Sequence, residues 1–203
     1  MRPISIAEIE TTIKRSAIDP YPMGTLPREA AVAVILRERG DDTEALFILR
    51  ATKEGDPWSG HMAFPGGHRD PPDASLRATA ERETLEEVGL DLTRDARFIG
   101  QIETVRANPR GSSINMAVIP YVYALERQEV TLTANYEVAD ILWGSLGEMI
   151  DGSSFTHDEF TIGGVRRSVP GYVIDEHIVW GLTLRMLEKF FELLDPAFES
   201  HDF

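Results

Sequence analysis

The chain has 203 residues, 42% of them hydrophobic and 27% charged, which suits one globular domain with a sizeable core. Its formal net charge of −14 argues against a nucleic-acid partner, because phosphate backbones are bound mainly through Lys and Arg. The absence of cysteine excludes a disulfide framework, a thiolate metal site and a cysteine nucleophile.

The N-terminal part is expected to form a helix over residues 5–15 and then an extended connector. Three isoleucines at helical spacing, Ile6, Ile9 and Ile13, give the helix one apolar face. The connector, residues 19–29, contains three prolines and one glycine, a composition typical of extended chain. We therefore divide the chain into an N-terminal helix and connector (1–29), a main domain (30–194) and a C-terminal tail (195–203).

The main domain combines strand-like and helix-like segments. Apolar β-type runs predict strands at 30–38, 44–50, 61–64, 97–105, 114–125 and 138–143. Helical patterns predict helices at 74–88, near 145–150 and at 177–194, and residues 153–176 are interpreted as a hairpin or loop. This order predicts an α+β fold in which helices flank a mixed β-sheet.

The helix predicted at 74–88 has start and stop signals. It is rich in Ala, Leu, Arg and Glu and holds no Gly or Pro. Asp73 or Ser75 can cap its start, and Gly89 can end it.

Near its end this helix carries three glutamates, Glu83, Glu86 and Glu87, at positions i, i+3 and i+4. This spacing places three carboxylates on one face, where they repel one another. A divalent cation is the simplest compensation, and carboxylate oxygens suit Mg²⁺, with Mn²⁺ as a usual substitute. The alternative is an ordinary solvated helix face, since glutamates on exposed helices are common.

The residues around the three glutamates favour the metal site over the solvated face. Gly66 and Gly67 let the backbone approach closely, so that a carbonyl oxygen there can add a ligand. Arg82 directly precedes the cluster and can pair with an acidic group in the loop before the helix.

The whole stretch resembles the Nudix box, a glycine followed by a spaced glutamate and an Arg-Glu-apolar-x-Glu-Glu-x-Gly-apolar helix. The matching positions are Gly67, Arg82, Glu83, Glu86, Glu87, Gly89 and Leu90. Three departures are visible: Asp73 replaces the spaced glutamate, one extra residue separates it from Arg82, and Thr84 occupies an apolar position. The resemblance implies the Nudix fold, an α/β/α sandwich.

Two further motifs resemble those of the coenzyme A diphosphatase-like branch of this family. One is the opening from Phe64 to Asp73, and the other is Trp180-Gly181-Leu182-Thr183. The resemblance covers roughly residues 30–190. The branch signature before Phe64 is only partly kept, because the arginine expected upstream of Gly60 is missing at that position.

The family resemblance implies a pyrophosphohydrolase in which Mg²⁺ or Mn²⁺ bridges the glutamates and the diphosphate. The expected metal ligands are Glu83, Glu86, Glu87 and Gly67, and the expected catalytic residues are Glu83, Glu86 and Arg82, with Glu83 or Glu86 as the base. The expected substrate-binding residues are Arg50, Gly66, Arg69 and Arg110, of which the arginines can each clamp a phosphate. Glu103 and Glu137 are candidates for a further acid from outside the box.

The substrate and partners stay open at this stage. The branch motifs favour coenzyme A or a derivative, and the alternatives are ADP-ribose, a nucleotide sugar, a dinucleoside polyphosphate, a modified nucleotide, or a non-catalytic nucleotide-binding role. No apolar run approaches the ~20 residues that cross a bilayer, and the first residues lack the apolar core of a signal peptide. We therefore expect a cytoplasmic protein with a small nucleotide-type substrate and no membrane or nucleic-acid partner, and its sequence is compatible with a homodimer.

Overall fold

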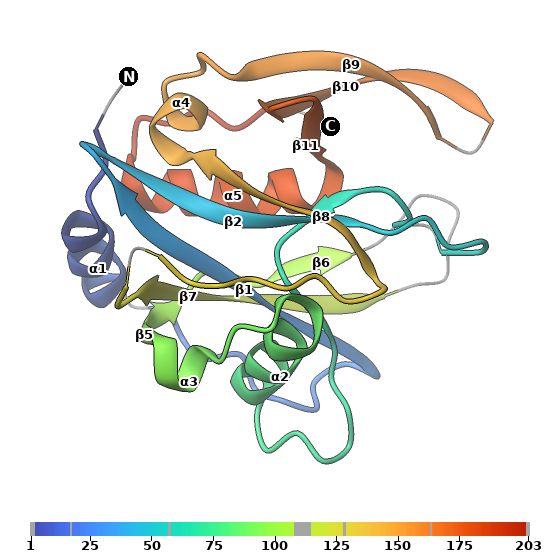
Figure 1. Cartoon of the computed structure of the whole chain (residues 1–203). Helices are drawn as coiled ribbons and strands as arrows, with labels where there is room; N and C mark the ends of the chain where they lie inside the picture. Colours follow the sequence, from blue (N-terminus) through green and yellow to red (C-terminus); the bar gives the residue numbers. More distant parts are fainter. Residues whose placement is uncertain are drawn as a thin grey trace.

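The computed structural model describes residues 3–16, 18–56, 58–107, 115–127, 129–162 and 164–201 (Figure 1). The elements are α1 (Ile6–Arg15), β1 (Arg28–Arg39), β2 (Asp42–Arg50), β3 (Met62–Ala63), β4 (Gly66–His68), α2 (Leu76–Val88), α3 (Leu92–Asp95), β5 (Ala96–Gln101), β6 (Val105–Ala107), β7 (Met116–Leu125), β8 (Val138–Ser145), α4 (Leu146–Ile150), β9 (Phe155–Ile162), β10 (Val165–Ile174), β11 (His177–Trp180) and α5 (Gly181–Leu194). In this part of the chain, no helix has the length and apolar character needed to span a membrane.

The strands β1 and β7 run parallel at the centre of the main sheet, in register from Arg28 opposite Met116 to Leu36 opposite Ala124. The strand order is β3-β2-β1-β7-β5, with β8 paired to β2, β4 to β1 and β6 to β7. These other pairings are antiparallel. The predicted mixed sheet flanked by helices is therefore confirmed.

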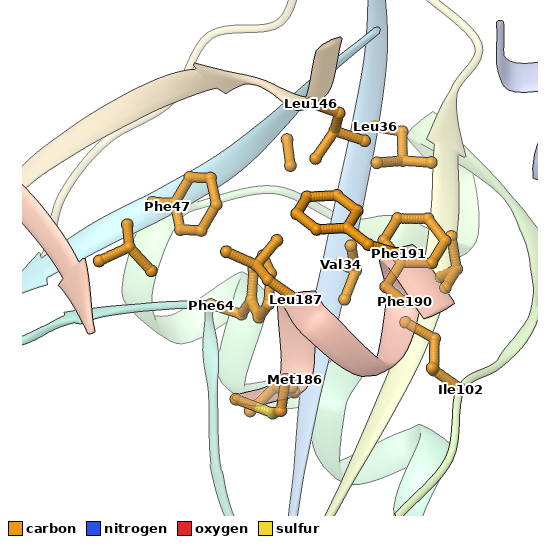
Figure 2. Close-up of a cluster of buried hydrophobic side chains, with 14 of the residues drawn as sticks. Val34, Leu36, Phe47, Phe64, Ile102, Leu146, Met186, Leu187, Phe190 and Phe191 are labelled. Atoms are coloured by element: carbon orange, nitrogen blue, oxygen red, sulfur yellow. The ribbon is translucent and has the colours of Figure 1, made fainter. Parts of the chain in front are cut away.

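The central strands are buried on both faces, and their side chains alternate between two cores. Val34 and Leu36 belong to the core that is shared with α1, α5 and the small sheet β11-β10-β9. Ala33 and Ile35 belong to the core on the α2 side. Figure 1 shows α5 between the small sheet and the main sheet, with α2 on the opposite side. Figure 2 shows the first core, with Phe190 and Phe191 of α5 beside Val34.

The structure corrects the predicted start of the last helix. Residues 177–180, predicted as helix, form β11, which pairs with β10 from Gly171 opposite Trp180 to Ile174 opposite His177. Gly181 adopts a left-handed φ of 64°, a conformation that favours glycine, and α5 begins there. The apolar run from His177 to Trp180 suits either a strand or a buried helix, so its pattern alone could not separate the two.

The predicted strand 97–105 is divided into β5 and β6. Both parts pair with β7, but Gln101 opposes Tyr121 whereas Val105 opposes Val118, so this side carries one extra residue. Pro120 lies opposite the break and has no N–H group for the ladder. The short helix α3 was not predicted. In residues 153–176 the strands β9 and β10 pair with each other, which confirms the hairpin alternative.

Candidate active site

The helix α2 is fixed at both ends as its sequence suggests. The Ser75 hydroxyl accepts a hydrogen bond from the Ala78 N–H at 3.1 Å, so Ser75 rather than Asp73 is the cap. Gly89 ends the helix with φ 70°. Thr84 faces the buried side, and its hydroxyl donates to the Ala80 carbonyl at 2.7 Å. This bond satisfies the polar group at the position where the family has an apolar residue.

Glu87 is the most buried of the three glutamates, with only 2% of its surface exposed. Its carboxylate accepts a hydrogen bond from the Gly66 N–H at 2.8 Å. The pKa of Glu87 is raised from its ordinary 4.5 to about 8, mainly by burial. The charges of Glu83 and Glu137 also raise it, whereas the Gly66 hydrogen bond and Arg50 lower it. The group thus lacks sufficient positive charge around it.

Glu83 lies against Gly67, and its position requires that residue 67 has no side chain. A Cβ atom at position 67 would lie 2.5 Å from the Glu83 Cδ and Oε1 atoms, which no real contact allows. Burial raises the pKa of Glu83, while neighbouring Arg82 lowers it. Gly66 is equally constrained, because a Cβ there would lie 2.3 Å from the Ala31 carbonyl oxygen.

Arg82 links the helix to the loop before it. Its Nε and Nη2 atoms contact the two oxygens of Asp73 at 3.0 and 3.1 Å, a bidentate pair that lowers the pKa of Asp73 from 3.8 to about 2. Its Nη1 atom lies 3.0 Å from Glu83 Oε1 and 3.4 Å from Glu86 Oε1. The link between Asp73 and Arg82 therefore survives the extra residue in the box.

The carboxylates fit a divalent cation by their chemistry but do not yet surround one. Among the described residues, no three carboxylate or imidazole groups are placed to hold one ion as they stand. Arg82 contacts Glu83 and the exposed Glu86, while Glu87 is turned to the Gly66 N–H. The donor set still matches a hard cation, since three carboxylates share one helix face and the buried one lacks compensating charge.

Of the other predicted residues, some lie close to the three glutamates. Arg50 binds Asp56 at 2.8 Å between Nη2 and Oδ2, and its buried Nε has no hydrogen-bond partner. Glu137 is near enough for its charge to raise the pKa of Glu87. Arg50 and Glu137 are therefore close to the helix face that carries Glu87.

The remaining predicted residues are placed differently. Arg69 lies beside the buried Glu29, with 4.0 Å between Nη1 and Oε2, and its buried Nε has no hydrogen-bond partner. Glu103 is an exposed residue that pairs with Lys189 of α5 at 3.3 Å. Arg110 lies outside the described residues.

A cavity of about 140 Å³ adjoins this site and was not foreseen from the sequence. Gly66, Gly67 and His68 form part of its wall, next to apolar side chains of β1, β7 and α5. The motif Trp180-Gly181-Leu182-Thr183 supplies another part of the wall, and the Thr183 hydroxyl donates to the Met62 carbonyl at 2.9 Å. The two branch motifs, this one and the opening from Phe64 to Asp73, were the sequence signals that could have located the cavity.

Comparison with known proteins gives the family. The family model described as NUDIX domain matches residues 26–162. An uncharacterized Schizosaccharomyces pombe protein is 37% identical over a stretch that covers 57% of this chain and 43% of that protein's length. The mitochondrial coenzyme A diphosphatase NUDT8 of Mus musculus is 30% identical, with 85% of this chain and 80% of the relative covered.

A solved structure agrees with the fold. The MutT/nudix family protein from Enterococcus faecalis superposes with a TM-score of 0.52 at 18% identity, covering 95% of this chain and 69% of that one. The helix with its three glutamates, the Gly66-Gly67 turn and the sheet between two helical layers all lie within a chain that belongs to the Nudix hydrolase family.

Proposed function

We propose that this protein is a metal-dependent pyrophosphohydrolase that cleaves the diphosphate of coenzyme A or a derivative. The observation that carries the proposal is the buried Glu87 carboxylate, which shares a helix face with Glu83 and Glu86 and lacks compensating positive charge. The substrate is supported by the branch motifs and by the mouse relative, whose name specifies coenzyme A diphosphatase.

In this proposal Glu83, Glu86, Glu87 and the Gly67 carbonyl hold Mg²⁺ or Mn²⁺. A bound ion supplies neutralisation of phosphate charge and acidifies water. For the ion to enter, Glu83 and Glu86 exchange their contacts with Arg82, which keeps its bidentate partner Asp73 and continues to fix the loop.

The protein's own residues then perform the hydrolysis. A water oxygen adds to one phosphorus, the bond from that phosphorus to the bridging oxygen breaks, and two phosphomonoesters result. Glu83 or Glu86 accepts the proton of the water. Arg50, Arg69 and Arg110 are proposed to bind the negative phosphate oxygens, with Glu137 as a further acid near Glu87 and Glu103 as a weaker candidate because it pairs with Lys189.

The test is a substrate screen with the pure protein. Coenzyme A, ADP-ribose, a dinucleoside polyphosphate and 8-oxo-dGTP are incubated with Mg²⁺, Mn²⁺ or chelator, and the products are identified by mass. Metal-dependent release of 3′,5′-ADP and 4′-phosphopantetheine from coenzyme A is the expected result. Cleavage of another substrate would keep the metal chemistry and reject coenzyme A, whereas metal binding without any turnover would favour a binding role.

Two further expectations stay predictions. The cytoplasmic location is untested, and the name of the mouse relative places that protein in mitochondria. A homodimer through the N-terminal segment or the final helix is likewise untested, and the mass of the protein in solution decides it.

A further inference from the structure

The cavity next to the proposed metal site lies on the side of the main sheet that carries α5. Its wall includes Ala30 and Val118 from β1 and β7, which belong to the same core as α5. It also includes Gly66, whose N–H holds the carboxylate of Glu87. A substrate whose diphosphate lies at Glu87 can therefore reach this cavity with the group attached to the diphosphate.

The inner wall is apolar and adaptable. This part of the cavity is lined by Met62, Phe64, Met116, Val118 and Met186, and we call it the methionine pocket. Figure 2 shows Met186 on α5 at one end of the core, beyond Leu187 and Phe64. Methionine side chains are flexible and polarizable, so they adapt to thin ligands and to sulfur.

The ionisable side chains of the cavity wall are Arg50, His61 and His68. Arg50 carries the permanent charge, and burial lowers the pKa of His61, which favours its neutral form. The methionine pocket itself contains no ionisable side chain. The methionine pocket therefore suits an uncharged part of a larger molecule whose charged part lies outside the pocket.

The cavity is small and suits the end of a ligand rather than a whole one. Its 140 Å³ has room for about five water-sized groups, well below the ~300 Å³ of the smaller sites that enclose a drug-sized ligand. The indole ring of Trp180, one of the aromatic side chains of the wall, is already engaged. Trp180 stacks on Phe160 at 4.4 Å and contacts His61 at 4.5 Å between ring centroids. A cavity of this size suits the end of a slender chain.

We propose that the methionine pocket binds the end of an uncharged, flexible chain attached to the diphosphate, such as the thiol end of a pantetheine arm, and limits the size of the group on that end. This inference rests on the proposed function, because it assigns the arm of the same substrate. The two halves of coenzyme A are then recognised in different places, and only the half with the pantetheine arm depends on this pocket.

The first experiment fills the pocket and measures binding of the two product halves by calorimetry. Ala30 is 5% exposed and lines the cavity, so Ala30→Leu places additional atoms inside it. We expect the Kd of 4′-phosphopantetheine to rise at least ~10-fold while the Kd of 3′,5′-ADP changes less than ~2-fold. Equal effects on both halves, or none on either, would overturn the inference.

The second experiment enlarges the pocket and serves if Ala30→Leu does not fold. Met186→Ala removes a pocket methionine, and Met149→Ala is the matched control, since Met149 is equally buried in the same core but lines a different cleft. We expect Met186→Ala alone to raise kcat/KM for a long-chain acyl coenzyme A relative to coenzyme A by at least ~10-fold. The same chain-length preference in both variants would contradict the inference.

These outcomes separate the inference from the proposed function. Wild-type protein that cleaves coenzyme A, with variants that leave arm recognition unchanged, would reject the pocket and keep the activity. Wild-type protein that cleaves ADP-ribose but not coenzyme A would reject the proposed substrate, and the pocket assignment with it.

Discussion

Glu87 gives the sharpest test of the metal site, because its carboxylate is buried and has too little positive charge around it. We expect Glu87→Gln to stabilise the metal-free protein. Glutamine keeps the length of the side chain, and its amide oxygen can accept the Gly66 N–H bond that the carboxylate accepts at 2.8 Å. The substitution therefore removes mainly the ionisable group.

The size and pH dependence of this effect follow from the pKa of Glu87, which burial raises from 4.5 to about 8. In the unfolded chain the carboxyl loses its proton above about pH 4.5, whereas in the folded protein it keeps the proton up to about pH 8. The folded state holds more protons in this window, so its stability falls as pH rises from 4.5 to 8. At pH 7 the loss is about 3 kcal/mol, and relaxation of the structure reduces it.

The assay is thermal unfolding in chelator between pH 4 and 8.5. The Tm of Glu87→Gln should equal that of the wild type near pH 4 and exceed it by roughly 6–12 °C at pH 7, as expected for about 3 kcal/mol in a chain of this length. Glu86→Gln is the matched control on the same helix, since the Glu86 side chain is 55% exposed and its loss should change stability by less than ~0.5 kcal/mol. Adding Mg²⁺ should raise the Tm of the wild type more than that of Glu87→Gln. A Tm of Glu87→Gln at or below the wild-type value at pH 8 would refute the account of an uncompensated buried charge.

Three further variants test the rest of the site. Glu86→Gln should cut turnover at least ~10²-fold with folding intact, because losing a metal ligand removes several kcal/mol of charge stabilisation; near-wild-type rates would end the metal-helix account. Asp73→Asn should lower the unfolding free energy by about 1–2 kcal/mol after screening of the Arg82 pair is allowed for, as measured in urea at pH 7. Since Arg82 lowers the pKa of Asp73 to about 2, this stability is present above about pH 4 and is lost as pH falls toward 2, and a difference that persists unchanged at pH 2 would contradict the assignment. Gly67→Ala should abolish turnover, because its Cβ would lie 2.5 Å from the Glu83 carboxylate, and unaltered kinetics would show that this close contact is unimportant.

The elements with a strong periodic pattern could be predicted from the sequence. The apolar run 30–38 and the helical pattern of 74–88 predicted β1 and α2 to within a few residues, because each pattern reflects burial of one element. The division of 97–105 could not be predicted, since it depends on Pro120 in another strand. The predicted start of α5 was wrong because His177–Trp180 pairs with β10 as a strand, and such pairing between separate segments is not visible in the local pattern.

The candidate site divides in the same way between local and distant effects. That three carboxylates share one helix face follows from spacing alone. Their different environments do not, because burial of Glu87 depends on its packing and on Gly66 of another strand. The different places of Glu137 and Glu103 also depend on tertiary structure. Glu137 influences the pKa of Glu87, whereas Glu103 pairs with Lys189.

The departure of the box at Asp73 shows how length and side chain compensate. Asp73 has a shorter side chain than the glutamate of the family pattern, but one extra residue lies between it and the helix arginine. Its Oδ2 atom accepts hydrogen bonds from the Asp70 N–H and the Thr79 hydroxyl, both at 2.9 Å, which fix the carboxylate outside the helix. From there both oxygens reach Arg82, at 3.0 and 3.1 Å. The longer loop thus carries the shorter acid to the arginine, and the geometry of the pair, rather than the spacing in sequence, is what the fold preserves.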